Sequence, residues 1–204
     1  MTQPRFRLVV LLSGSGSNLQ AILEAIRNGG LPGVDVVLVV SDRASAYGLE
    51  RAAQAGVPTL FFPIRPFTQA GQTRQDYDTA LAAALASHAP DLIVCAGWMR
   101  ILSPAFLERF PGRIINLHPA LPGVLAGKDS LRGTFEAATR GEPIPTGCMV
   151  HRVIAEVDAG AVIDTEAVPI APGDTLETFA DRMHEAEHRL IVRAIAKVLG
   201  LSTR

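Results

Sequence analysis

The stretch RLVVLLSGSGSN, residues 7–18, decides the fold class of this chain. Its first half is a continuous aliphatic run, which is typical of a strand covered on both faces of a sheet. Its second half is a loop of glycine and serine that leads into a helical pattern. A buried strand, a glycine loop and a helix in this order predict the first unit of an α/β sheet.

The same alternation continues through most of the chain. Further strands are predicted at residues 34–41, 59–64, 91–97 and 113–118. Helices are predicted at residues 18–27, 44–55 and 74–88, with a short helical turn at 104–109. Because strand–helix–strand units use right-handed crossovers, these elements imply an open, doubly wound, mostly parallel sheet of Rossmann-like type.

The pattern changes after Gly141. Two apolar segments around a polar turn predict an antiparallel C-terminal hairpin at one side of the sheet. A long C-terminal helix follows, with Asp174 or Thr175 as its N-cap and its end near Leu199. Nothing in the sequence looks like a linker, so residues 1–204 are expected to form a single domain.

The composition favours a protein that acts on small molecules. A net charge of −1, spread evenly along the chain, argues against nucleic acid as a partner. Cys95 and Cys148 lie in apolar runs without ligand spacing, so neither a disulfide nor a metal site is expected. The N-terminal apolar run is short and leads into the glycine loop, and no run has transmembrane length, so a cytoplasmic protein is predicted.

The glycine loop predicts an anion site. Gly14 and Gly16 allow a tight turn, and Ser17 and Asn18 stand where the helix begins and its amide groups have no intrahelical partner. Such a helix start at the carboxyl end of a strand suits a phosphate group.

Two alternatives stay open for this loop, a plain turn and a dinucleotide site. The dinucleotide pattern needs a third glycine for close helix packing, and this chain has Leu19 in that part of the helix. Asp42, after the second strand, would nevertheless resemble the carboxylate that binds ribose in such sites.

The stretch INLHPALPG, which begins at Ile115, places Asn116 and His118 on the same side of a strand end. An amide and a protonated imidazole are suitable donors to an oxygen that becomes negative during acyl transfer. Asp158, in the predicted turn of the late hairpin, is the best candidate to orient His118. The alternatives are a satisfied histidine at a sheet edge and an ordinary turn aspartate.

The sequence offers no obvious protein nucleophile. It has no serine on an elbow, no cysteine beside the histidine and no cluster of metal-binding side chains. The nucleophile is therefore expected to come from a substrate, which indicates group transfer.

With the glycine loop, GWMRILSP, INLHPALPG and VDAGAVI in this order, nearly the whole chain resembles the phosphoribosylglycinamide formyltransferase family. The resemblance implies an open α/β sheet and transfer of a formyl group from 10-formyltetrahydrofolate, a co-substrate, to the amine of glycinamide ribonucleotide in purine synthesis. It implies catalytic roles for Asn116, His118 and Asp158. For the phosphate and ribose of the ribonucleotide, the resemblance implies binding by Gly16, Ser17, Asn18 and Glu187. For the folate, it implies binding by Arg74, Met99, Arg100, Ile101, Leu102 and Asn116.

Two features depart from the family pattern. Ala120 stands where the family usually has serine, and KDSLRGTF, from Lys128, lacks the usual histidine, so details of residues 120–132 do not carry over.

The predicted partners are two small molecules, with no nucleic acid or membrane and with a homodimer left open.

Other functions remain as alternatives. Formyltetrahydrofolate hydrolase resembles this family but has an additional N-terminal domain, and methionyl-tRNA formyltransferase has an additional C-terminal domain. Sugar-nucleotide formyltransferases are related as well. From other classes, a non-catalytic nucleotide-binding module and a dinucleotide-dependent oxidoreductase using Asp42 are retained.

Overall fold

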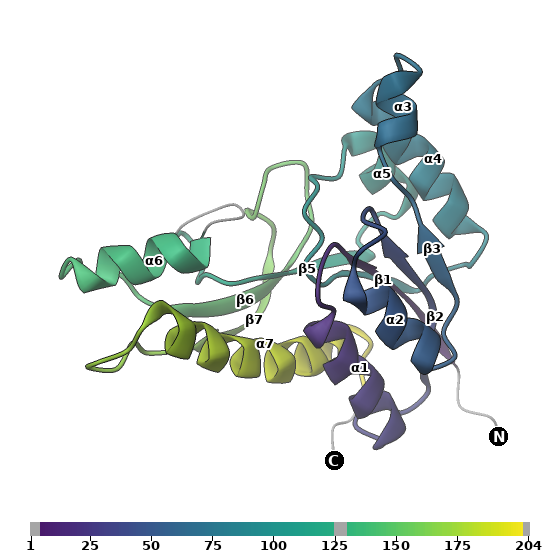
Figure 1. Cartoon of the computed structure of the whole chain (residues 1–204). Helices are drawn as coiled ribbons and strands as arrows, with labels where there is room; N and C mark the ends of the chain where they lie inside the picture. Colours follow the sequence, from purple (N-terminus) through teal and green to yellow (C-terminus); the bar gives the residue numbers. More distant parts are fainter. Residues whose placement is uncertain (1–4, 125–129, 202–204) are drawn as a thin grey trace.

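The computed structural model describes residues 5–124 and 130–201. Within these residues, one sheet contains seven strands in the order β3-β2-β1-β4-β5-β6-β7 (Figure 1). The strands are β1 (Phe6–Leu12), β2 (Val34–Ser41), β3 (Thr59–Phe61), β4 (Leu92–Cys95), β5 (Ile114–His118), β6 (Gly147–Arg152) and β7 (Val162–Ala167). The helices are α1 (Ser17–Arg27), α2 (Tyr47–Gln54), α3 (Arg65–Gln69), α4 (Arg74–Ala86), α5 (Pro104–Arg109), α6 (Ser130–Thr139) and α7 (Leu176–Val198).

The sheet confirms the predicted topology. Strands β1 to β5 pair in parallel, and β6 and β7 are added antiparallel beside β5. The chain runs outward from β1 to β3 and then returns to place β4 on the other side of β1. The winding therefore reverses between β1 and β4, which is where such sheets open a ligand crevice.

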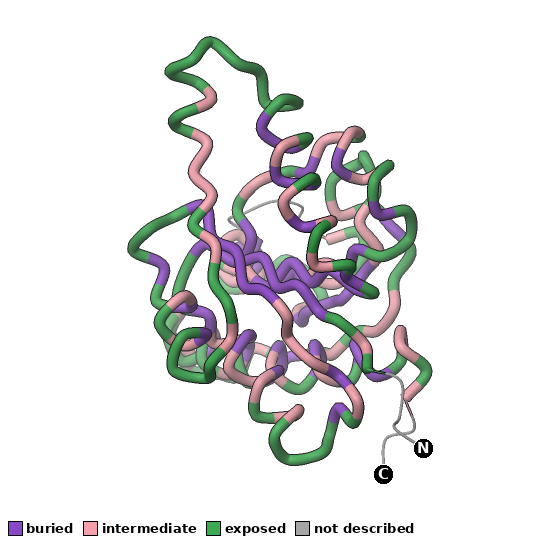
Figure 2. Tube along the Cα trace, turned by 90° about the vertical axis from the view of Figure 1, so that its right-hand side faces the viewer, coloured by how far each residue is buried: buried purple, intermediate pink, exposed green. Residues whose placement is uncertain are grey.

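Two apolar cores cover the two faces of the sheet. One lies under α1, α2 and α7, and includes Leu19, Ile22 and Ile191. The other lies under α4 and α5, and includes Tyr77 and Phe106. The central strands are buried along most of their length (Figure 2), as expected for strands covered by helices on both sides.

Some elements differ from the sequence prediction. Strand β3 ends at Phe61 because Pro63 cannot donate a ladder hydrogen bond. Helices α3 and α6 were not predicted, since α3 is a single short turn with Pro66 near its start and α6 lies in the segment that departs from the family pattern. Lys128 and Asp129 of that segment lie outside the described residues.

The connection in the late hairpin is longer than the turn that the sequence predicted. Residues 153–161 form a longer loop between β6 and β7. Asp158 lies in this loop and contacts Asn116 and His118 at the end of β5.

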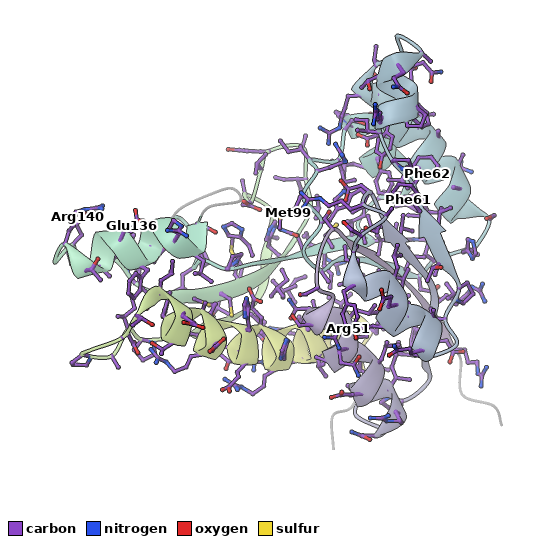
Figure 3. All side chains as sticks on the ribbon, viewed as in Figure 1. Arg51, Phe61, Phe62, Met99, Glu136 and Arg140 are labelled. Atoms are coloured by element: carbon purple, nitrogen blue, oxygen red, sulfur yellow. The ribbon has the colours of Figure 1, made fainter. Side chains whose placement is uncertain are left out.

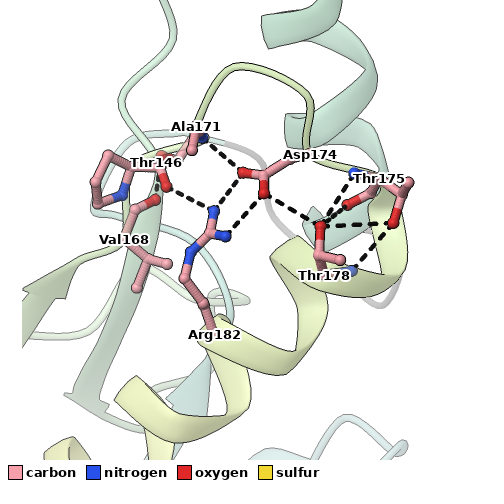
Figure 4. Close-up of polar contacts among 8 residues, drawn as sticks. Thr146, Val168, Ala171, Asp174, Thr175, Thr178 and Arg182 are labelled. Atoms are coloured by element: carbon pink, nitrogen blue, oxygen red, sulfur yellow. Dashed lines mark hydrogen bonds and ion pairs between the residues drawn. The ribbon is translucent and has the colours of Figure 1, made fainter.

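Thr175, and not Asp174, is the N-cap of α7 (Figure 4). Its hydroxyl accepts a hydrogen bond from the Thr178 amide at 3.2 Å, and the Thr178 hydroxyl accepts one from the Thr175 amide at 3.0 Å. Asp174 instead accepts from the Ala171 amide at 2.6 Å and pairs with Arg182. The reciprocal bonds satisfy two amides at the helix start.

Candidate active site

A cavity of about 620 Å³ opens at the carboxyl ends of the parallel strands. Its walls come from the loops after β1, β4 and β5, the β6–β7 loop and one face of α7. A volume of this size is ordinary for a small-molecule site. The structure thus brings together the segments that the sequence placed at the winding reversal.

The glycine loop forms one wall of this cavity. Gly16 has a φ of 71° and is the N-cap of α1, so the first amides of that helix are directed to the cavity edge. Gly16, Ser17 and Asn18 all line the cavity. The local geometry fits an anion site at a helix start.

This loop is held by the first turn of α2. A Cβ on Gly16 would lie 2.5 Å from the Cα of Gly48, so the two backbones approach too closely for any side chain. The Gly48 amide donates to the Gly14 carbonyl at 3.1 Å, and the Arg51 Nε donates to the Ser15 carbonyl at 3.0 Å. Arg51 is labelled in Figure 3.

Glu187 of α7 lies beside the loop. It accepts a hydrogen bond from the Asn18 amide nitrogen at 3.3 Å and is 7% exposed. Burial raises the pKa of its carboxyl, although the Asn18 hydrogen bond and nearby His184 oppose that rise. His184, which the sequence did not single out, also lines the cavity.

Asn116, His118 and Asp158 meet on the opposite wall. The Asn116 amide donates to Asp158 Oδ1 at 3.3 Å, and His118 Nδ1 lies 3.5 Å from Asp158 Oδ2. Asn116 and His118 lie two residues apart on β5 and both line the cavity, as strand geometry predicted. The carboxylate can hold the imidazole ring in one orientation through the proton on Nδ1.

His151 completes this group and was missed in the sequence. It stands directly opposite Asn116 in the antiparallel pairing of β5 with β6. Its Nδ1 lies 2.9 Å from the Arg152 carbonyl, which only an N–H can satisfy, and its Nε2 lies 3.2 Å from the Asn116 side-chain nitrogen. Nε2 is also 3.4 Å from Asp158 Oδ1. The only available signal was the strand register, which GCMVHRV does not reveal by itself.

The backbone of Asp158 adopts a left-handed conformation with φ 54°. This conformation is uncommon outside glycine, but Asp tolerates it better than most residues. It costs on the order of 1–3 kcal/mol and is retained mainly where function requires a side chain at that point.

The segment Met99–Leu102 forms the wall between the glycine loop and β5. Met99 (labelled in Figure 3) and Ile101 are 56% and 58% exposed, whereas Leu102 is buried. The Arg100 guanidinium pairs with Asp42 at 2.8 Å. Arg74 does not line the cavity, and its Nε lies 3.6 Å from Asp78; its role in folate binding stays a prediction.

The dinucleotide alternative loses its main support. The Asp42 carboxylate is buried and faces Arg100, so it is not displayed as a ribose-binding group would be. Leu19 is fully buried in the core under α1 and supplies packing where a dinucleotide fold would have glycine.

Residues 5–124 and 130–201 contain neither a metal-binding cluster nor a membrane-spanning helix. No group of three or more His, Cys, Asp or Glu side chains there is placed to hold a metal ion. None of the helices described there combines the length and apolarity needed to cross a bilayer.

The chain belongs to the formyl transferase family, whose sequence model matches residues 6–195. It is 48% identical to the phosphoribosylglycinamide formyltransferase of Schizosaccharomyces pombe, over 94% of this chain and 96% of the relative. The enzyme of the same name from Dictyostelium discoideum is 42% identical, over 93% of this chain and 96% of the relative. The crystal structure of glycinamide ribonucleotide transformylase 1 from Symbiobacterium toebii superimposes with a TM-score of 0.87 at 41% identity, covering 96% of this chain and 89% of that one.

Proposed function

We propose that this chain transfers the formyl group of 10-formyltetrahydrofolate to the amine of glycinamide ribonucleotide. The products are formylglycinamide ribonucleotide and tetrahydrofolate, in the synthesis of purines. A cytoplasmic location fits substrates of this kind.

One observation carries the proposal. Asn116, His118 and Asp158 converge on a single point of a cavity whose opposite wall is a glycine loop at a helix start. The arrangement provides donors for a reacting carbonyl oxygen and a separate seat for a phosphate group. The match of this chain to phosphoribosylglycinamide formyltransferases over nearly their whole length supports the same reaction.

The ribonucleotide phosphate would bind the amides at Gly16, Ser17 and Asn18, with Glu187 near its ribose. The formylfolate would lie along Met99–Leu102. Holding both substrates in one cavity removes much of the entropic barrier, a contribution on the order of several kcal/mol.

In the chemical step, the substrate amine attacks the formyl carbon and a C–N bond forms. The carbonyl oxygen becomes negative and accepts hydrogen bonds from Asn116 and protonated His118. Because the Asn116 amide already donates to Asp158 and lies 3.2 Å from His151 Nε2, the oxygen competes with these two partners for the Asn116 N–H groups. The bond from carbon to the folate nitrogen then breaks, and the amine proton passes by way of water to that nitrogen, with Asp158 orienting His118.

The direct test is to mix the protein with glycinamide ribonucleotide and 10-formyltetrahydrofolate and follow the absorbance change as tetrahydrofolate is released. Release that depends on the amine acceptor supports the proposal. Release at the same rate without the acceptor would instead identify a hydrolase, and no release with both substrates would reject formyl transfer.

A further inference from the structure

Three side chains from other parts of the fold, namely the loops after β1 and β2 and helix α4, hold the segment between β4 and α5. At its start, the Met99 amide donates to the Ser13 hydroxyl at 3.0 Å, just after β1. At its end, the Ser103 amide donates to Asp78 Oδ2 of α4 at 2.8 Å. Ser13 and Asp78 are both buried, so neither bond has to compete with bulk water.

The third anchor acts on the middle of the segment. The Arg100 Nε lies 2.8 Å from Asp42 Oδ2, with side-chain exposures of 26% and 2%. The guanidinium also lies over the ring of Tyr77, 5.9 Å from its centroid. The charge of Arg100 is therefore held between a buried carboxylate and an aromatic face, which restricts where this side chain can lie.

The neighbours of Arg100 in the segment differ in exposure. Met99 and Ile101 project outward and are more than half exposed, while Leu102 packs into the core. If Arg100 left Asp42, the middle of this segment would lose its ion pair and keep only the contact of Arg100 with the Tyr77 ring and the packing of Leu102. We call residues Met99–Leu102 the folate wall.

The packing beneath the folate wall is not optimised for stability. Five buried side-chain atoms there have no hydrogen-bond partner among the described residues: Asp42 Oδ1, Asp78 Oδ1, Trp98 Nε1, Arg100 Nε and Ser103 Oγ. The contact of Arg100 Nε with Asp42 Oδ2 is therefore an ion pair without hydrogen-bond geometry. An unsatisfied buried polar atom is destabilising, so native proteins contain few of them. Their concentration under one wall of the cavity fits a segment held for its position.

We propose that Asp42 is a positioning residue that, through Arg100, holds the folate wall in the shape that accepts the formylfolate. This inference rests on the proposed function only in naming the ligand of the wall. The anchoring itself is a property of the free protein.

The test compares Asp42→Asn with a control at a distant ion pair. Asp174 and Arg182 form a pair of similar burial, with exposures of 8% and 38%, at the start of α7 (Figure 4). For Asp42→Asn we expect the KM for formylfolate to rise roughly tenfold, with kcat and the KM for the ribonucleotide changed less than about twofold. Asp174→Asn should lower thermal stability and leave all three constants near wild type.

Trp98, the single tryptophan of the chain, adjoins the folate wall and reports on it without any substrate. Its emission maximum in the free protein should shift in Asp42→Asn and stay unchanged in Asp174→Asn. Arg100→Gln should reproduce the effects of Asp42→Asn, and the double variant should be no worse than Arg100→Gln alone, because the two residues act as one unit.

A wild-type KM for formylfolate together with an unchanged Trp98 spectrum in Asp42→Asn would overturn the proposal. The proposal would also be overturned if the KM for formylfolate in the double variant rose by the product of the two single-variant factors. Should the wild-type protein release no tetrahydrofolate, the proposed function would fail, while the Trp98 comparison would still decide whether Asp42 holds the wall. If Asp42→Asn fails to fold, Arg100→Gln and its spectrum carry the same test.

Discussion

His118 comes from the end of β5 and Asp158 from the β6–β7 loop, where Asp158 has a strained backbone conformation. His118 ends β5, where its side is set by strand alternation. Asp158 reaches it from the β6–β7 loop through a left-handed residue. A costly backbone conformation at a carboxylate beside the histidine supports a chemical role for the pair.

Replacing His118 with Ala should lower kcat by roughly a hundred- to a thousand-fold, because one donor to the developing oxyanion is lost. Asp158→Asn should also lower kcat strongly, since the amide cannot accept from and orient the imidazole in the same way. The measurement is steady-state turnover together with equilibrium binding of each substrate, which we expect to change little. A comparable loss of folate affinity in both variants would contradict these roles.

Glu187 provides a pH-dependent test of the phosphate wall. Because burial raises the pKa of this carboxyl in the folded protein, its contribution to stability is present in acid and is lost as pH rises through that raised pKa. Glu187→Gln keeps an acceptor for Asn18 and removes the buried charge. The melting temperature of the Glu187→Gln variant should therefore equal that of the wild-type protein near pH 4. At pH 7 to 8 it should be higher than that of the wild-type protein.

Thermal melts of both proteins across this range check the prediction. Each unit by which the pKa is raised corresponds to about 1.4 kcal/mol. The same difference in melting temperature at pH 4 and pH 7 would show that Glu187 does not carry the effect. Ribonucleotide affinity should fall in the same variant if Glu187 contacts the ribose.

At this scale, the sequence predicted the positions of Asn116 and His118 because the alternation of a strand is a local property. It missed His151, whose place opposite Asn116 depends on the register of two distant strands. It also left the distance between His118 and Asp158 undetermined.

At the scale of elements, the contact between the glycine loop and α2 depends on two glycines. Gly16 combines a positive φ with a Cβ position 2.5 Å from the Gly48 backbone. Gly14, two residues earlier, has nothing within 4 Å of its Cβ position. Gly14 therefore serves as the control position for a substitution at Gly16 in the same loop.

Gly16→Ala should destabilise the protein by about 2 kcal/mol or more, from the left-handed conformation and the displaced backbone of Gly48. Gly14→Ala should stay within about 1 kcal/mol of wild type. Chemical denaturation of both variants measures the difference. Equal losses would show that the close approach of the loop to α2 is not what requires Gly16.

The parallel strands and main helices were predictable because each has a strong local period and clear boundaries. α3 was not, since a single turn containing proline reads as a loop. The β6–β7 loop was predicted too short, because its polar sequence does not encode how far it must extend to reach β5.

For the whole molecule, two thiols report on the two cores. Cys95 packs in the core under α4 and α5, and Cys148 packs in the core under α1, α2 and α7. Burial raises the pKa of the Cys95 thiol to about 12 and that of the Cys148 thiol to about 12. At pH 8 only about one thiol in ten thousand would carry the reactive negative charge.

Alkylation in native buffer at pH 8 should therefore be very slow, and both cysteines should be modified promptly once the protein is denatured. Mass spectrometry after timed quenching counts the modified thiols. If the sheet opens as one unit, both should react with the same rate at intermediate denaturant. Rapid native labelling of either cysteine would show that its core opens separately.

The sequence by itself determined the order of the elements, the parallel sheet and the segments that border the cavity, because apolar periodicity and glycine loops act over a few residues. The tertiary structure decided what meets across the cavity: Asp158 with His118, His151 with Asn116, Glu187 with Asn18, and Asp42 with Arg100. These contacts join segments far apart in the chain. Their distances depend on strand register, loop reach and burial, which only the packed sheet and its helices establish.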